Sequence, residues 1–117
     1  MTSCTSYCLE LCDGSCAAPV GDSLEAWQAA LGAWTLRTFG GSRTRETLVH
    51  LAEEVAELLD ADAAGAGHEE EAADVLILLL CYADRRGFSL ATALARKHAV
   101  NLGRTWREGE DGMIRHV

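Results

Sequence analysis

The sequence has little of several features, and each scarcity excludes a class of protein. Lysine and arginine together number 10 against 18 aspartates and glutamates, so the net charge is −8. Nucleic acid and acidic membrane surfaces are therefore not expected as direct partners. The longest apolar run, residues 75–83, is too short to cross a membrane. The N-terminus has neither the basic start nor the apolar core of a signal peptide, so we expect a cytoplasmic protein.

Breaks in the chain are also scarce. One proline and no internal repeat in 117 residues indicate a helical chain with short connections. Apolar periodicity and capping signals predict four helices, at about 23–38, 44–60, 69–86 and 89–106. A chain of this length buries a small core, which indicates that a second subunit completes it. We therefore predict an all-α fold: a four-helix bundle completed by oligomerisation.

Residues 1–21 differ in character from residues 22–117, which we expect to form the functional domain. Four cysteines recur in this segment at every fourth position, a spacing that matches zinc sites poorly. Disulfides are disfavoured in a cytoplasmic setting. We expect an N-terminal arm without chemistry, with a structural metal as the less favoured alternative. The cysteines are Cys4, Cys8, Cys12 and Cys16.

Two acidic clusters stand at the centre of the chain. Glu53, Glu54 and Glu57 fall on one arc of the helix predicted over 44–60, because each residue turns about 100° around the axis. Taken alone, this arc is equally typical of a solvated helix face, since glutamate is a good helix former. The first cluster therefore becomes informative only together with the second.

Glu71 and Asp74 form the second cluster, one turn apart on the next predicted helix. Glu71 alone fits an acid favoured at a helix start. Asp74 directly precedes the apolar run 75–83, where the helix is expected to be buried, and an isolated carboxylate there is costly unless it is paired or bound to metal. Converging carboxylates repel one another unless cations neutralise them. Magnesium, a hard cation that prefers oxygen ligands, is the expected ion.

A polar and basic stripe follows on the last predicted helix. Lys97, Asn101 and Arg104 share one face and are able to neutralise a polyphosphate held by metals. A solvated helix face explains the same pattern. On the first predicted helix, Trp34 ends an apolar stripe that begins with Leu24, Trp27 and Leu31. Trp34 is either a core residue or a surface on which a nucleobase stacks.

These motifs resemble those of a known family. E-E-x-x-E at 53–57 and E-x-x-D at 71–74 resemble the signature of the MazG-like all-α nucleoside triphosphate pyrophosphatases, and K-x-x-x-N-x-x-R at 97–104 resembles the pattern that follows it. The resemblance covers residues 23–106. Shorter features resemble the dATP/dGTP diphosphohydrolase subgroup, which includes phage-encoded members. They are Phe39-Gly40, His50-Leu51, 73–78, Arg85-x-Gly87, Asn101-x-x-Arg104-x-Trp106 and His116-Val117.

The resemblance implies hydrolysis of a nucleoside triphosphate, dGTP or dATP, between the α and β phosphates, giving the monophosphate and pyrophosphate. Glu54, Glu57, Glu71 and Asp74 would hold two or more magnesium ions, or manganese in their place, which activate the attacking water. Glu53, or Glu54 if it bridges ions, would orient that water or take its proton.

The substrate contacts that the resemblance implies come from the basic stripe. Lys97 and Arg104 would offset charge on the leaving pyrophosphate, and Asn101 would bond the phosphate or the sugar. Family members are dimers or dimers of dimers with the site near the subunit interface. A homodimer or homotetramer is therefore expected, in which Trp34 or Lys97 serves the neighbouring site.

Two other classes remain to be compared with this one. A non-enzymatic helical module would use the acidic helices for protein docking, and it predicts no metal dependence and no nucleotide binding. A di-iron or di-manganese carboxylate bundle normally carries Glu-x-x-His on its ligand helices. That pair is absent from the sequence, which counts against the second alternative. His50, one turn from Glu54, is interpreted as a surface histidine that approaches the substrate only in the less favoured case.

Overall fold

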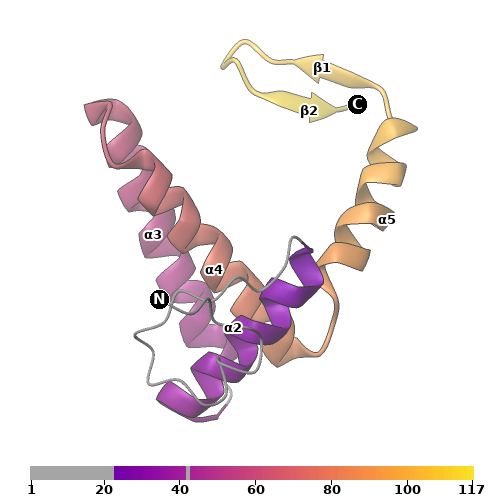
Figure 1. Cartoon of the computed structure of the whole chain (residues 1–117). Coiled ribbons are helices and arrows are strands. Elements are labelled where there is room, and N and C mark those ends of the chain that lie inside the picture. The colour runs from indigo at the N-terminus through magenta and orange to yellow at the C-terminus, as the bar shows by residue number, and fades with distance from the viewer. Residues whose placement is uncertain (1–22, 42) are drawn as a thin grey trace.

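A glycine follows the end of each of the four helices (Figure 1). The computed structural model describes residues 23–41 and 43–117. Four α-helices followed by a β-hairpin make up this part of the chain, which confirms the all-α prediction and adds a small sheet to it. The predicted arm, residues 1–21, and its four cysteines lie outside the described residues. The elements are α2 (Leu24–Phe39), α3 (Thr44–Ala64), α4 (His68–Arg86), α5 (Leu90–Leu102), β1 (Trp106–Glu108) and β2 (Ile114–His116).

α3 and α4 form a tight helical hairpin and lie side by side (Figure 1). Gly65 ends α3 at φ 75° and Gly67 caps the start of α4 at φ 81°, both in the left-handed region that favours glycine. The sequence predicts a turn over 61–68, but α3 continues to Ala64. Residues 61–64 contain no helix breaker, so the helix ends only where glycine allows the chain to reverse.

α2 packs across α4 through small and polar side chains. Its buried residues are Gln28, Gly32 and Thr35. A Cβ atom on Gly32 would collide with the Asp84 carboxylate, so glycine permits this close approach. The predicted core stripe of α2 therefore differs from the one observed, because Trp27 is 41% exposed in the single chain.

The core of the single chain is small and lies towards the C-terminal half of α4. Leu80, Cys81 and Ala83 are its buried hydrophobic residues. The N-terminal half of the same apolar run is open, since Leu76 and Ile77 are 46% and 36% exposed. The prediction that α4 is buried all round is therefore wrong for one chain, because α2 and α3 cover only part of its surface.

A buried glutamine fixes the start of α5. Gln28 on α2 donates from Nε2 to the Phe88 carbonyl at 2.7 Å and accepts the Leu90 N–H at 3.0 Å through Oε1. These bonds hold the turn between α4 and α5, beyond which α5 leads away from the α3–α4 pair (Figure 1). The four predicted helices are thus all present, and the last one projects from the others.

The C-terminal hairpin was not among the predicted elements. The sequence predicts a helix to residue 106, but α5 ends at Leu102, followed by Gly103. β1 and β2 pair antiparallel, with Trp106 opposite His116, and Gly112 takes φ 80° in the turn. The Arg115 guanidinium donates to the Asp111 carboxylate at 2.9 Å and holds the pKa of that carboxyl below its usual range.

None of the helices in the described part of the chain combines the length and the apolar character needed to cross a membrane. The cytoplasmic location expected from the sequence remains a prediction.

Candidate metal centre and nucleotide cavity

The α3–α4 hairpin brings the two acidic clusters together. Glu54 of α3 and Glu71 and Asp74 of α4 each place one carboxylate oxygen within 4.8 Å of the other two. Glu57, one turn after Glu54, lies near enough to the same group for the charges of Glu54 and Asp74 to raise its pKa. The spacing of the motifs allows this because residues one turn apart on each helix face the same neighbour across the hairpin.

Two carboxyl groups of this cluster have raised pKa values, partly because they repel their neighbours. The pKa of Glu57 is raised above the ordinary glutamate value, first by a hydrogen bond with the Glu54 carboxyl and then by the Glu54 charge. The pKa of Glu71 is raised chiefly by removal from water, and further by its contacts with Glu54 and Glu57. Without a cation, Glu57 and Glu71 therefore hold protons more tightly than separate glutamates would.

Two oxygens of the cluster lack a partner. Glu54 Oε2 and Glu71 Oε2 are buried and accept no hydrogen bond from the described residues. A buried carboxylate oxygen without a donor is costly, and a divalent cation with oxygen preference would satisfy both at once. The donor set therefore fits a metal ion better than it fits a structural network.

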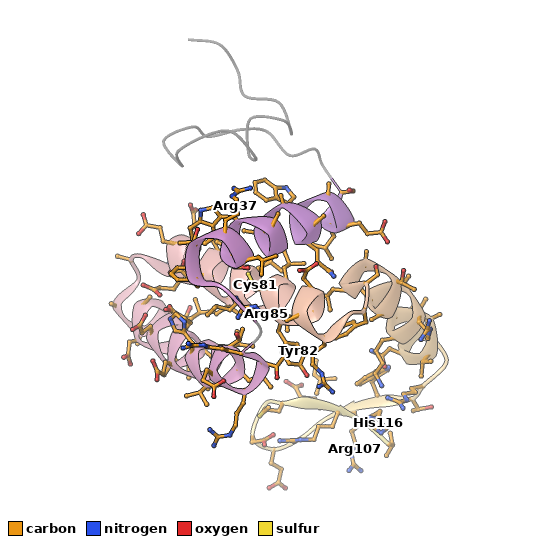
Figure 2. The ribbon with its side chains drawn as sticks, turned by 90° about the horizontal axis from the view of Figure 1, so that it is seen from below. Arg37, Cys81, Tyr82, Arg85, Arg107 and His116 are labelled. Carbon is orange, nitrogen blue, oxygen red and sulfur yellow. The ribbon has the colours of Figure 1, made fainter. Side chains whose placement is uncertain are left out.

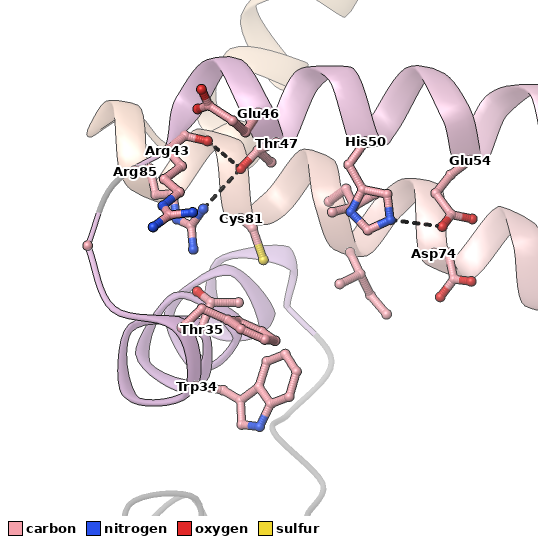
Figure 3. A pocket seen from close by; sticks show the side chains of 14 residues that line it. Trp34, Thr35, Arg43, Glu46, Thr47, His50, Glu54, Asp74, Cys81 and Arg85 are labelled. Carbon is pink, nitrogen blue, oxygen red and sulfur yellow. Dashed lines mark hydrogen bonds and ion pairs between the residues drawn. The ribbon is translucent and has the colours of Figure 1, made fainter.

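His50 contacts one carboxylate oxygen of Glu54, a candidate metal ligand. His50 Nε2 lies 3.1 Å from Glu54 Oε1, one turn along α3 (Figure 3). The side chain of Glu54 is only 14% exposed, while that of His50 is 56% exposed. This contact fixes one Glu54 oxygen and leaves the second in the cluster. The residue interpreted as a surface histidine therefore contacts the site directly.

A cavity of about 540 Å³ extends from this cluster between α2, α3 and α4. Figure 3 shows the carboxylates of Glu54 and Asp74 at one end and the guanidinium groups of Arg43 and Arg85 at the other. The remaining lining includes two aromatic rings, two threonines and aliphatic side chains. The lining residues are Trp34, Thr35, Phe39, Gly41, Arg43, Glu46, Thr47, His50, Glu54, Asp74, Ile77, Leu78, Cys81 and Arg85.

The basic end of the cavity is ordered by a buried hydroxyl. Thr47 Oγ1 donates to the Arg43 carbonyl at 2.7 Å and accepts from Arg85 Nη1 at 2.9 Å. Figure 2 shows Arg85 and Cys81 in the interior between α2 and α3. Cys81 is buried, and burial raises the pKa of that thiol. This wall therefore carries one fixed cation beside a protonated thiol.

The residues predicted for the site are divided between two places. Glu54, Glu71 and Asp74 converge, with Glu57 beside them, and Trp34 lines the adjoining cavity. Glu53 is exposed and contributes no oxygen to the cluster.

The basic stripe lies apart from this cavity. Lys97, Asn101 and Arg104 lie on or just beyond α5 and do not line it. Asn101 instead accepts from Arg104 at 3.4 Å through its side chain and from Trp106 Nε1 at 2.9 Å through its carbonyl.

Several residues that line the cavity were not predicted from the sequence as site residues. Thr35, Thr47 and Arg85 come from three helices and form no spaced motif. Thr35 and Thr47 are polar residues that are buried in the structure. Their polarity alone did not indicate in the sequence that they line a cavity. Arg85 was noted only within a short family feature. Nothing in the spacing linked it to Thr47, which lies 38 positions earlier.

The match to a family model decides which family this fold and site represent. The model of the dATP/dGTP pyrophosphohydrolase matches residues 27–117. The chain belongs to this family. The matched region includes the acidic cluster, the cavity, α5 and the C-terminal hairpin. The predicted resemblance to nucleoside triphosphate pyrophosphatases is therefore confirmed, and the docking-module alternative loses its support.

Two curated phage proteins are similar to this member of the dATP/dGTP pyrophosphohydrolase family. A dATP/dGTP diphosphohydrolase of Salmonella phage PMBT28 is 42% identical over 90 residues, which are 77% of this chain but 30% of that protein. A dATP/dGTP diphosphohydrolase of cyanophage S-2L is 36% identical over 91 residues, which are 77% of this chain and 84% of that protein. The chain thus spans less than a third of the first relative and most of the second.

A solved structure also matches this family member. The cyanophage S-2L MazG-like pyrophosphohydrolase, bound to dGDP and three catalytic Mn²⁺ ions per active site, has a TM-score of 0.70 at 32% sequence identity. The match covers 83% of this chain and 99% of that one. The MazG-like fold prediction is confirmed, and the predicted use of divalent metal agrees with the ions in that relative.

Proposed function

We propose that this chain hydrolyses a purine deoxynucleoside triphosphate, dGTP or dATP, between the α and β phosphates, releasing the monophosphate and pyrophosphate. The observation that carries the proposal is the convergence of Glu54, Glu71 and Asp74 at one end of a 540 Å³ cavity. Family membership and the dGDP-bound, Mn²⁺-bound relative support it. A cavity of this size fits a nucleotide.

The acidic end would hold divalent ions through Glu54, Glu57, Glu71 and Asp74. Magnesium and manganese both suit such an oxygen donor set. When bound, these ions supply positive charge to the phosphate oxygens and acidify water. Glu54 would orient the attacking water and take its proton; the contact of His50 with Glu54 Oε1 and the unpartnered Glu54 Oε2 support this role. Glu53 is exposed, and its predicted catalytic role remains a prediction.

The other cavity walls would position the nucleotide. Trp34 and Phe39 form an edge-to-face pair with centroids 5.6 Å apart and present an aromatic surface at the cavity. A base stacked there and a triphosphate directed towards the carboxylates would be oriented for attack at the α phosphate. Holding the reacting groups in this geometry lowers the entropic part of the barrier.

We also propose that a homodimer or homotetramer completes the site. Lys97, Asn101 and Arg104 lie away from the cavity of their own chain, so they would contact the phosphates in the site of a neighbouring copy. Apolar side chains exposed on α3 and α4, such as Leu59 at 68% and Leu76 at 46%, support burial against a second copy. An interface there would also give α4 the burial that its sequence predicts.

Product analysis tests the reaction. Purified protein is incubated with each common ribo- and deoxyribonucleoside triphosphate, with Mg²⁺, with Mn²⁺ or with chelator, and the products are separated. We expect monophosphate and pyrophosphate only when metal is present, with dGTP or dATP as the fastest substrate. Release of single phosphates, or no turnover of any nucleotide with either metal, would refute the proposal.

A further inference from the structure

The end of the cavity opposite Glu54 and Asp74 contains the guanidinium groups of Arg43 and Arg85, neither of which the hydrolytic chemistry uses. Arg85, in the last turn of α4, is half-buried and lines the cavity. Its Nη1 donates to Thr47 Oγ1 at 2.9 Å, while the Thr47 hydroxyl donates to the Arg43 carbonyl at 2.7 Å. The hydroxyl therefore fixes the direction of the guanidinium.

The Arg85 guanidinium has N–H groups that the Thr47 hydrogen bond does not use. In residues 23–41 and 43–117 the ion pairs are His50–Glu54 and Arg115–Asp111, so no carboxylate is within ion-pair distance of Arg85. A guanidinium carries five N–H donors in a rigid planar fork, and the Thr47 bond uses one of them. A planar ligand with two adjacent acceptors is the natural partner for the remaining donors.

The charge distribution decides which part of a nucleotide reaches Arg85. A triphosphate with its metals belongs at the Glu54 and Asp74 end, so the base extends towards the opposite end, where Figure 3 shows Arg85, with Trp34 on the α2 side of the cavity. Guanine presents O6 and N7 as two adjacent acceptors. Adenine presents N7 beside an amino donor, which opposes the N–H groups of an arginine.

We propose that Arg85 recognises the O6 and N7 edge of guanine and so makes dGTP the preferred substrate over dATP. This inference rests on the proposed function. Thr47 is the positioning residue, because its hydroxyl holds the guanidinium at the end of the cavity. Arg85 is the specificity-determining residue and takes no part in breaking the phosphate bond.

Binding of nucleoside diphosphates tests the assignment without hydrolysis. The dissociation constants of dGDP, dADP and 7-deaza-dGDP are measured calorimetrically with Mn²⁺ for the full chain and for Arg85→Met. We expect the variant to bind dGDP about 5- to 150-fold more weakly, the range of a lost bidentate arginine–guanine contact, and to bind dADP within about twofold of the unmodified protein. Removal of N7 in 7-deaza-dGDP weakens binding to the unmodified protein but not to Arg85→Met.

The neighbouring arginine provides a matched control. Arg86 is exposed on the same turn of α4 and does not line the cavity, so Arg86→Met keeps both affinities. Thr47→Val is a second variant that retains Arg85 but removes its acceptor. It loses part of the preference for dGDP, and Thr47→Ser restores it.

Two results would overturn the assignment. Equal weakening of dGDP and dADP by Arg85→Met would mean that Arg85 binds phosphate, and unchanged binding of both would mean that it binds neither. The hydrolysis assay separates these results from failure of the proposed function. If the unmodified protein cleaves triphosphates but Arg85→Met keeps the preference for dGDP over dADP, only the role of Arg85 is contradicted. If the unmodified protein cleaves no triphosphate, the proposed function itself is contradicted.

Discussion

The two ends of the cavity are built in different ways. The acidic end takes like charges from two helices that are consecutive in the chain and joined by a turn at Gly65 and Gly67. The basic end takes two arginines, two threonines and an aromatic pair from α2, α3, α4 and the α2–α3 connection. The carboxylates of the acidic end repel one another when no cation is bound. The basic end is ordered by the hydrogen bonds of Thr47 with Arg43 and Arg85.

This difference suggests that the acidic end serves the chemistry and the basic end serves substrate selectivity. A self-repelling cluster gains from binding cations, so its energy depends on what occupies it. A preordered donor keeps its direction in the empty site and therefore selects among ligands by shape and hydrogen bonding. Chemistry and selectivity are thus expected to respond to different substitutions.

The largest effect is expected at the acidic end. Asp74→Ala removes one metal ligand candidate, and we expect kcat/KM to fall about 1,000-fold or more, since a bound metal contributes several kcal/mol to transition-state stabilisation. Circular dichroism should show a folded protein. Glu70→Ala, on an exposed position of the same helix, is the control and should retain activity. An active Asp74→Ala protein would remove the metal site from this cluster.

A smaller effect is expected where His50 meets Glu54. His50→Leu removes the contact to Glu54 Oε1 at 3.1 Å, and we expect Mn²⁺ to bind about 10-fold more weakly, as is usual when a group that orients a metal ligand is lost. Calorimetric titration with Mn²⁺ measures this directly. His50→Gln retains a donor and should recover most of the affinity. Equal Mn²⁺ binding by all three proteins would show that His50 does not position Glu54.

The smallest effect concerns stability against pH. The pKa values of Glu57 and Glu71 are raised in the folded chain, so the folded state binds protons more tightly than the unfolded state does. These groups therefore destabilise the metal-free protein progressively as pH rises from the ordinary glutamate value of 4.5 through their raised values. Glu71→Gln should raise the thermal midpoint above that pH in chelator, and saturating Mn²⁺ should reverse the order. A pH-independent difference would show that the pKa of Glu71 is not raised in the folded chain.

The acidic end could be predicted from the sequence for a physical reason. Helical periodicity fixes which residues share a face, and a short turn between two helices fixes which faces meet. Spacing therefore predicted that the two acidic clusters converge, and the family resemblance selected Glu54, Glu57, Glu71 and Asp74 from them. Spacing did not distinguish Glu53, one residue away, because an arc of glutamates does not show which member turns towards the neighbouring helix.

The basic end could not be predicted in this way. Its geometry depends on where α2 crosses α4, which is set by the close approach of Gly32 to Asp84 and by buried polar side chains such as Gln28. Neither has a periodic signature. The hairpin after α5 was missed because its strands are three residues each and exposed, so they lack the alternation that marks a longer strand.

The tight turn at Gly65 and Gly67 also bears on how the molecule assembles. Contacts between residues close in sequence cost little loop entropy and form early in folding. The α3–α4 hairpin is therefore expected to bring its carboxylates together before α2 docks and closes the cavity. A divalent ion present at that stage would bind the half-folded chain, so the metal that serves the reaction would also favour the fold that contains it.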